Sequence, residues 1–443
     1  MTVLGLDDTD SRERGMCTTY LAARVAERLR ERGRVDRLLL VRLNPAVEAK
    51  TRGNAALAVH TDVPATEALT VAADELASLA AVEDPRTSPG VVVAEGAASG
   101  VPASVAEFAR RTVRDRQELD DALALAESVG FAHRGWGSNP TGRGRIGALA
   151  AVGAWNAFEE WTYEHVSYRA FDRCGTPRAV DEGSVFDAAA DAYPTAWDTV
   201  DREAGEAVCV PNAPGPVLYG VRGDDPEAVR RVAAGIDSER VERTALFRTN
   251  QGTDAHLRRA ASLADLRDGR AYRVDGVVAG DPETRAGGHV FVPIREGESE
   301  SGSDADGDGA SARERPVTVD CVAFEPTERF RDRVRALRTG DRVTVCGEVG
   351  RGTLKLEKFA LREPVTTEQR VPDCPDCGRR MSSAGRDQGY RCRDCATAAP
   401  GKESVPLDRD LDVGWYEVPP VARRHVAKPL VRGGFDAPTR PER

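Results

Sequence analysis

MTVLGLDDTDS (residues 1–11) places an apolar run directly before three carboxylates that fall within four positions. The run from Thr2 to Leu6 has the length and composition of a buried strand. A helical pattern from Thr18 to Arg32 follows, so Asp7, Asp8 and Asp10 stand between a strand end and a helix start. This order predicts an α/β unit with an acidic site at the carboxyl end of its first strand.

These carboxylates have two interpretations. Oxygen ligands at a strand end suit Mg²⁺ and a bound phosphate group, whereas a solvated acidic turn is the simpler alternative in so acidic a chain. Thr18 opens the helix, where free N–H groups and the helix dipole favour an anion. A threonine at that position is also common as a plain helix cap.

The rest of the chain divides by pattern into further units. The expected fold is multidomain, α/β plus α+β, because helical, mixed and strand-alternating segments follow one another. The predicted units are an α/β domain at 1–150, a ferredoxin-like βαββαβ layer at 155–268, an OB-fold β-barrel at 270–363, a zinc ribbon at 370–400 and a basic tail at 401–443. A Gly/Ser/Asp/Glu-rich stretch at about 296–315 is expected to be a disordered insertion in the barrel.

Composition narrows the class of protein. The 443 residues contain no apolar run of eighteen and begin without a basic leader, so we expect neither a membrane span nor a secretory signal, and a cytoplasmic protein. The net charge is −10, and only five of the 62 basic residues are lysines. Such usage resembles the proteins of salt-loving microbes, so net charge says little about partners.

Four cysteines form the most specific local pattern. Cys374 and Cys377 form one CxxC pair, and Cys392 and Cys395 form another fourteen residues later. This spacing is typical of a zinc ribbon, in which four thiolates close a structural site. Two redox pairs are the alternative, but the intervening Gly-rich segment lacks the βαβ context that they require.

Two loops are weaker candidates for phosphate contacts. Lys50, Arg52 and Asn54 lie in a basic loop between two expected strands, and a lysine ammonium suits a phosphate, although all three could be solvated. The segment 142–147 matches GxGxxG without a preceding strand, so a dinucleotide site is not expected. Its Arg143, Gly144 and Arg145 could still hold a triphosphate at a helix start.

Two further patterns receive structural interpretations. Residues 163–169 alternate as a strand, and we expect their polar side chains to face solvent. The remaining cysteines outside the N-terminal site have no ligand-spaced neighbours and are expected to be buried structural thiols: Cys174, Cys209, Cys321 and Cys346.

Several motifs together resemble one family. They are GLDDTDS, RLNPAVEAKTRGNAA, GRGRIGALAA, TYEHVSYR, GTPRAVD, PVLYGVRGD and, above all, FRTNQGTDAHL at 247–257. They resemble the archaeal tRNA(Ile) 2-agmatinylcytidine synthetases over nearly the whole chain. That resemblance implies a kinase-like domain, a ferredoxin-like domain, an OB-fold and a zinc ribbon, in this order.

The resemblance also implies a reaction. The protein would use ATP to attach agmatine to carbon 2 of the wobble cytidine of the CAU-anticodon isoleucine tRNA. Asp7, Asp8 and Asp10 would be the metal and general-base carboxylates, and Thr18 matches a threonine that the family phosphorylates. The loop residues Lys50, Arg52 and Asn54 would steady phosphates. The implied cofactors are ATP, Mg²⁺ and structural Zn²⁺, and the implied partner is RNA rather than DNA.

Agmatine is a dication, so its site should contain carboxylates. Asp198 and Asp201 lie beside Trp197 and are the expected pair, although an ordinary acidic face is an equal alternative. Two other functions remain open: an ATP-dependent RNA kinase or ligase that uses another amine, and a non-catalytic RNA-binding protein built on the barrel and the ribbon.

Overall fold

The N-terminal half of the chain forms one mixed sheet flanked by helices. The computed structural model describes residues 1–13, 15–47, 53–137, 141–297 and 317–443. The sheet has nine strands in the order β5-β4-β1-β3-β2-β9-β6-β8-β7. Their bounds are Thr2–Asp7 (β1), Val35–Arg42 (β2), Ala55–Thr61 (β3), Gly90–Glu95 (β4), Ala132–Gly135 (β5), Thr162–Tyr168 (β6), Ala196–Trp197 (β7), Val217–Gly223 (β8) and Arg243–Thr249 (β9).

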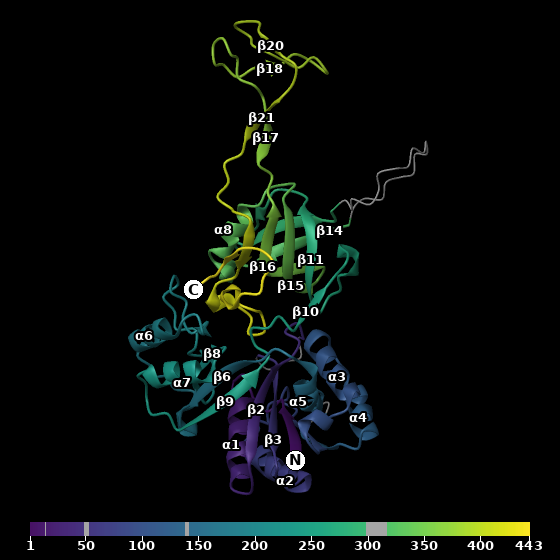
Figure 1. Cartoon of the computed structure of the whole chain (residues 1–443), viewed down its shortest axis with the longest axis vertical. Coiled ribbons are helices and arrows are strands. Elements are labelled where there is room, and N and C mark those ends of the chain that lie inside the picture. The colour runs from purple at the N-terminus through teal and green to yellow at the C-terminus, as the bar shows by residue number, and fades with distance from the viewer. Residues whose placement is uncertain (14, 48–52, 138–140, 298–316) are drawn as a thin grey trace.

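This sheet crosses the boundary that the sequence predicts near residue 150. β2 runs parallel to β9 and pairs with it at Leu39–Arg248 and Leu40–Thr249. The two units expected at 1–150 and 155–268 therefore share one continuous sheet (Figure 1). Sequence periodicity missed this because a strand pattern does not say which partner a strand pairs with.

Helices cover both faces of the sheet. The bounds are Thr18–Arg30 (α1), Ala65–Leu79 (α2), Ala103–Arg114 (α3), Leu119–Ser128 (α4), Arg145–Ala157 (α5), Glu182–Ala192 (α6) and Pro226–Gly235 (α7). α1 and α2 bury one apolar cluster against β1, β2 and β3, and α3, α4 and α5 bury another on the opposite face. α6 and α7 bury a third with β8. β1 thus lies inside the sheet, with helices packed on both of its faces.

A closed five-stranded barrel follows. β11 (Arg270–Val278), β13 (Val290–Arg295), β14 (Thr318–Ala323), β16 (Thr353–Glu363) and β15 (Arg342–Gly350) pair in this cyclic order. Short strands β10 (Leu257–Arg259) and β12 (Glu283–Thr284) extend its edges, and α8 (Phe330–Arg335) packs beside it. Most of the predicted insertion at 296–315 lies outside the described residues.

The segment predicted as a basic tail is folded against the barrel. β22 (Gly414–Glu417) pairs with β16, and β23 (Thr439–Arg440) pairs with β22. Its basic side chains form internal ion pairs, such as Arg424 with Glu348 and Glu357, and Arg432 with Glu160 and Asp224. Counting charge along the chain could not reveal these pairs, because their acidic partners lie far away in the sequence.

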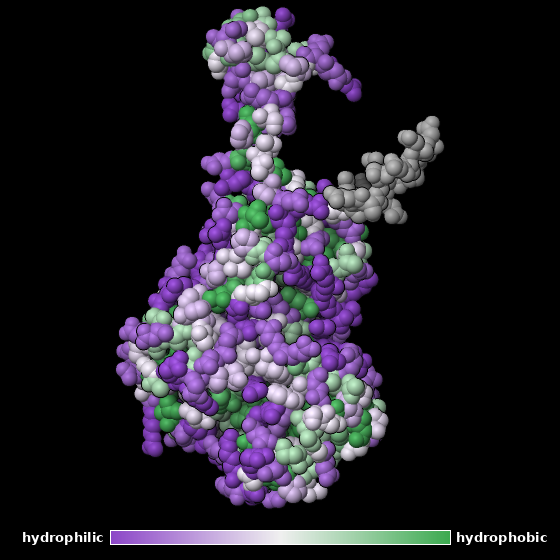
Figure 2. Space-filling model, in the orientation of Figure 1, coloured by the Kyte–Doolittle hydropathy of each residue, from purple (hydrophilic) through white to green (hydrophobic). Residues whose placement is uncertain are grey.

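A small cysteine-bearing module stands apart from the body. β17 (Thr367–Arg370) and β21 (Glu403–Pro406) form a two-stranded stalk that carries β18 (Ser382–Ser383), β19 (Tyr390–Arg391) and β20 (Ala398–Ala399). Figure 1 shows this module at one end of an elongated molecule. Hydrophilic residues cover much of the visible surface in Figure 2. None of the helices described is long and apolar enough to cross a membrane.

The segment 247–257 joins the sheet to the barrel. Asn250 uses its amide to bond both backbone groups of Arg42, at 2.7 Å and 3.0 Å. Asp254 accepts hydrogen bonds from the Lys358 ammonium at 2.8 Å and the Lys428 backbone N–H at 2.7 Å. His256 lies 2.9 Å from Glu357 of the barrel. The most distinctive motif of the sequence is therefore a structural junction.

Replacing Lys358 by methionine tests this junction. The Lys358 side chain is 1% exposed, so its removal leaves the Asp254 carboxylate without its main counter-charge. We expect a loss of about 3–5 kcal/mol in the free energy of unfolding, the cost of breaking a buried ion pair. Chemical denaturation measures it, and Lys355→Met, on the same strand but at a partly exposed ion pair with Glu348, should cost under about 1 kcal/mol. Equal effects of the two substitutions would refute the junction.

Candidate functional site

A cavity of about 510 Å³ opens where the two parts of the long sheet meet. The end of β1 and the first turns of α1 and α5 line one side. β6, β8 and the loop before β8 line the other side, and His425 comes from the C-terminal segment. A volume of this size holds a ligand as large as a nucleotide.

The end of β1 supplies the acidic side of the cavity. Asp7 follows five buried strand residues, and its Oδ1 accepts the backbone N–H of Asp8 at 2.6 Å. Burial raises the pKa of Asp7 well above its usual range, and the negative charges of Asp8 and Asp10 raise it further. A cation or a proton at this position would relieve that repulsion.

α5 approaches this carboxylate closely because glycines occupy its cap position, Gly144, and the third position of its first turn, Gly147. A Cβ on Gly147 would lie 1.9 Å from Asp7 Oδ2, and one on Gly144 would lie 2.6 Å from the Asp7 carbonyl oxygen. Any side chain at Gly147 would therefore displace Asp7. The GxGxxG pattern serves here to bring the start of a helix against the acidic site.

Arg143 lies in the cavity wall and contacts the acidic cluster. Its guanidinium donates to Asp8 Oδ2 at 2.6 Å and to the Arg86 carbonyl at 2.7 Å. Burial raises the pKa of Asp8, and the charge of Arg143 opposes that rise. Arg143 is thus held where it faces both the carboxylates and the cavity.

Thr18 begins α1 at the same cavity. It is 7% exposed, and its hydroxyl accepts a hydrogen bond from the Thr9 hydroxyl at 3.1 Å. Cys17, at the cap position, makes no side-chain cap bond, so the first N–H groups of the helix are not covered by it. The structure thus brings Asp7, Asp8, Asp10, Thr18, Arg143 and Gly144 together at one cavity.

The opposite side carries charged residues to which the sequence analysis gave no role. Glu164 of β6 is buried in the cavity wall and accepts a hydrogen bond from Gln251, and Arg42 lies 3.9 Å away. Arg222 also lines the cavity. The expectation that the polar residues of 163–169 face solvent is wrong for Glu164, Ser167 and Arg169, which are all buried. Glu164 shares a strand face with Thr162 and Val166, both buried, and that alternation was the available signal.

The positive charge on this side perturbs a histidine. His425 borders the cavity with part of its surface open to solvent. The neighbouring Arg42 charge lowers the pKa of His425 well below the usual range, and desolvation by the surrounding segments and the charge of Arg222 act in the same direction. The imidazole is therefore neutral at pH 7. Burial also lowers the pKa of Arg42, although an arginine remains charged.

The basic loop is described only in part. Lys50 and Arg52 lie outside the described residues. Asn54 lines the cavity, and its side-chain amide donates to the Asn44 carbonyl at 2.7 Å. This hydrogen bond ties the start of β3 to the segment that follows β2.

Three predicted site residues lie elsewhere. Arg145 turns back to donate to the Gly142 and Thr141 carbonyls and does not line the cavity. Asp198 is buried against Arg423, with Arg222 at 3.9 Å, and Asp201 is buried against Arg329 at 3.1 Å. Both aspartates form ion pairs with arginines that lie much later in the chain. Their position beside Trp197 in the sequence could not indicate these partners. None of the three residues lines this cavity.

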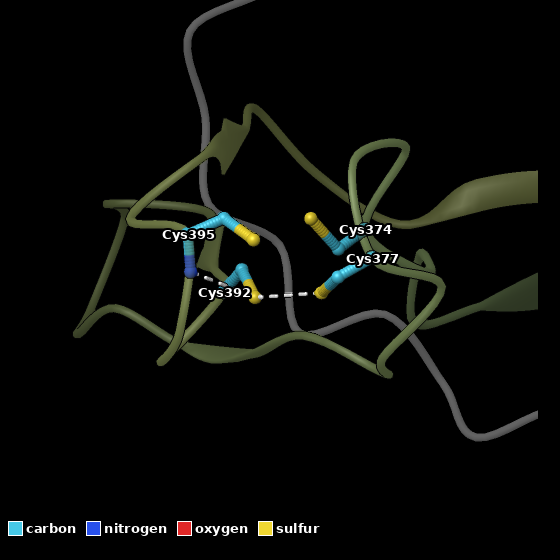
Figure 3. A group of neighbouring side chains, drawn as sticks. All are labelled: Cys374, Cys377, Cys392 and Cys395. Carbon is cyan, nitrogen blue, oxygen red and sulfur yellow. Dashed lines mark hydrogen bonds between the residues drawn. The ribbon is translucent and has the colours of Figure 1, made fainter.

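The four predicted zinc ligands come together. The Sγ atoms of Cys374, Cys377, Cys392 and Cys395 all lie within 4.8 Å of one another. Figure 3 shows the sulfurs of the two CxxC loops pointing towards one another, with Cys377 Sγ 3.6 Å from Cys392 Sγ. Sulfurs at about 2.3 Å from a tetrahedral zinc lie about 3.8 Å apart, so the cluster fits a closed zinc site.

Comparison with known families agrees with this geometry. Family models match residues 3–63 (TiaS TCKD domain), 142–256 (TiaS FLD domain) and 371–411 (TiaS C-terminal zinc ribbon domain). The chain is 55% identical to the tRNA 2-agmatinylcytidine synthetase TiaS of Haloquadratum walsbyi over 468 residues, covering 100% of both. The chain belongs to the TiaS family. The Methanosarcina mazei TiaS is 45% identical over 97% of each chain.

Solved TiaS structures share the whole architecture. The crystal structure of TiaS in complex with its isoleucine tRNA and ATP matches 100% of this chain and 99% of that chain, with a TM-score of 0.86 and 38% identity. The complex of TiaS with the same tRNA, AMPCPP and agmatine matches with a TM-score of 0.84 and 36% identity over the same shares. The resemblance that the motifs indicated is therefore confirmed.

Proposed function

We propose that the chain is an ATP-dependent ligase that attaches agmatine to carbon 2 of the wobble cytidine of the CAU-anticodon isoleucine tRNA. The observation that carries this proposal is the cavity, which three carboxylates, Thr18 and the buried Glu164 line together. TiaS relatives crystallised with their isoleucine tRNA, ATP and agmatine support it. A cytoplasmic location follows from a tRNA substrate.

The reaction needs an activated carbonyl. The cytidine O2 attacks a phosphorus of ATP, so an O2–P bond forms and a P–O bond of the nucleotide breaks. The agmatine amine then attacks carbon 2, and the C2–O2 bond breaks as the phosphate leaves. The cytosine must leave its stack to enter the cavity.

The acidic side fits the phosphoryl step. Asp7, Asp8 and Asp10 would hold Mg²⁺, which offsets phosphate charge, and the carboxylate donors with a raised pKa at Asp7 suit a cation there. In a step separate from the attack of O2, the Thr18 hydroxyl oxygen would form a bond to the γ-phosphorus of an ATP, the P–O bond between the β- and γ-phosphates would break, and ADP would leave. Arg143, Gly144 and the loop residues Lys50, Arg52 and Asn54 would contact nucleotide phosphates.

The opposite side fits the amine. Agmatine carries a guanidinium and an ammonium, and Glu164 is a buried carboxylate in the cavity wall. A cation in contact with Glu164 would recover the cost of burying that charge. We therefore assign the agmatine contact to Glu164 rather than to Asp198 and Asp201.

Strand order supports finer domain assignments. The order β9-β6-β8-β7, with α6 and α7 in the two crossovers, is that of a ferredoxin-like unit. The cyclic order of the barrel, with β14 parallel to β16, favours an OB-fold, a common nucleic-acid-binding barrel. We infer that residues 1–150 form the kinase-like part.

Nucleoside mass spectrometry tests the proposal. The full chain is incubated in concentrated KCl with Mg²⁺, ATP, agmatine and unmodified CAU-anticodon isoleucine tRNA. The wobble cytidine should gain agmatine only when every component is present. ATP turnover on tRNA without amine incorporation would instead favour an RNA kinase, incorporation of a different amine would favour another ligase, and tRNA binding without turnover would leave only a binding protein.

Glu164→Gln tests the agmatine contact. The amide keeps the size of the side chain but removes the charge that faces the amine, so we expect the KM for agmatine to rise about 10- to 100-fold, the value of a charge-assisted hydrogen bond. Steady-state kinetics with varied agmatine measure it. Glu239→Gln, at a buried ion pair with Arg169 outside the cavity, should leave that KM unchanged. An unchanged KM in Glu164→Gln would refute the assignment.

A further inference from the structure

A second cavity, of about 450 Å³, lies where β2 and β9 separate. The two strands pair only at Leu39–Arg248 and Leu40–Thr249. Residues 35–38 of β2 and 243–247 of β9 precede these pairs in their strands. On the edges that these two segments turn towards each other, neither has a strand partner among the described residues. α1 borders this gap on one side and the start of α7 on the other, so the cavity shares no residue with the catalytic one.

The cavity concentrates positive charge in an acidic protein. Arg30, Arg37, Arg230 and Arg248 line it, and among ion pairs between described residues only Arg230 has one, with Glu227. Its two carboxylates are already neutralised by arginines outside the cavity: Glu27 pairs with Arg243 at 2.8 Å and Asp36 with Arg34 at 2.6 Å. In the described part of the chain, Arg30, Arg37 and Arg248 therefore have no carboxylate partner within ion-pair distance.

Two of these arginines are held close together. The guanidinium of Arg37 lies 4.0 Å from the centre of the Trp155 ring, and that of Arg248 lies 5.5 Å from the same centre. Arg248 also lies 5.7 Å from the Tyr163 ring. Burial and the charge of Arg248 lower the pKa of Arg37. Aromatic rings thus hold two like charges side by side, an arrangement that a bound anion would stabilise.

A buried polar atom points to the same conclusion. His165 lines the cavity, and its Nδ1 is buried without a hydrogen-bond partner. Burial and the charge of Arg230 lower the pKa of His165 to about 4, so the ring is neutral at pH 7. A neutral ring nitrogen can donate one hydrogen bond to an oxygen of an anion.

We propose that this cleft, built by Arg30, Arg37 and Arg248 around the separated strands, binds phosphate groups outside the catalytic cavity. The phosphates belong either to the backbone of a bound RNA or to a free phosphate compound. Guanidinium forks match phosphate oxygens in both. Binding here does not require the proposed ligation.

Binding measurements on the full chain, without agmatine or Mg²⁺, test the cleft. The probes are inorganic pyrophosphate in isothermal titration and the CAU-anticodon isoleucine tRNA in filter binding at several salt concentrations. The variants are Arg248→Gln and Arg30→Glu. Arg259→Gln is the control, since this arginine is 80% exposed on the barrel. Arg30 is also exposed at the end of α1, so its variant remains informative should Arg248→Gln fold poorly.

Two results would support the cleft. If RNA is the source, tRNA affinity falls about tenfold in both variants and the slope of log K against log salt becomes shallower by about 1. If a free phosphate compound is the source, both variants bind one equivalent of pyrophosphate fewer than the control does. Their tRNA affinity then matches that of the control. Both variants matching Arg259→Gln in both assays would overturn the proposal. Neither assay measures turnover. A negative result for phosphate binding at the cleft is therefore distinct from a negative result for the proposed ligase activity.

Discussion

Asp7→Asn is expected to lower the turnover number for agmatinylated tRNA by about 10³-fold, in the range that loss of an acid–base carboxylate causes. The amide can still accept the Asp8 backbone N–H, so the bend after β1 should survive. The change removes the charge that would hold Mg²⁺ and accept a proton. Quenched-flow or discontinuous assays with saturating ATP, agmatine and tRNA measure the rate.

A matched control distinguishes the loss of a negative charge at the cavity from the loss of a negative charge elsewhere on the protein. Asp74→Asn removes one carboxylate from the exposed side of α2 and should leave turnover unchanged. tRNA affinity should not fall in Asp7→Asn, because the Asp7 carboxylate repels rather than attracts phosphates. If Asp7→Asn turned over at the wild-type rate, the proposal that the acidic cluster takes part in the reaction would be wrong.

The same burial predicts a pH dependence. Because burial and the neighbouring carboxylates raise the pKa of Asp7, the charged form is lost as pH falls through that raised value. An ordinary carboxyl loses its charge at about pH 4. We expect the acidic limb of the kcat/KM profile to lie at a higher pH than that. Asp7→Asn should abolish this limb in the residual activity, whereas Asp74→Asn should retain it.

Local patterns predicted that the acidic residues and Thr18 lie together, although their roles stay predictions. Asp7 and Thr18 belong to one strand end and one helix start that are adjacent in the chain, so periodicity and polar residues at the ends of elements were enough to bring them together. The zinc cluster was predictable for the same reason, since CxxC spacing encodes its own geometry. In both cases the residues that act together are near one another in the sequence.

The other half depends on tertiary contacts. Glu164 meets Arg42 because β9 joins β2 to the second part of the sheet, a pairing that neither strand encodes alone. Asp198 was predicted as an agmatine ligand because an acid beside a tryptophan suits a dication. It is instead neutralised by Arg423, 225 residues away. No count of charge along the chain reveals such a partner.

Thr18→Val is expected to reduce agmatine incorporation by at least about 10³-fold if the hydroxyl accepts a phosphate during the reaction, because a nucleophile has no substitute within the side chain. Valine has the shape of threonine, and Thr18 loses only the hydrogen bond from Thr9, so α1 should still form. Incubation with γ-³²P ATP should label the wild-type protein and leave Thr18→Val unlabelled. Thr18→Ser, which restores the hydroxyl, should recover both label and activity in part.

The serine variant distinguishes a chemical role from a structural one. If Thr18 has only a structural role in the first turn of α1, valine and serine should differ by no more than about 1 kcal/mol, the value of one hydrogen bond such as that from Thr9, and neither should alter labelling. If the hydroxyl carries phosphate, label and turnover must be lost and regained together. Thr18 lies beside the carboxylates of β1 at the one cavity that they share. In the proposed mechanism, adjacent segments of the chain would therefore supply the carboxylates of the phosphoryl step and the Thr18 hydroxyl, whereas Glu164 in the second part of the sheet would bind the amine.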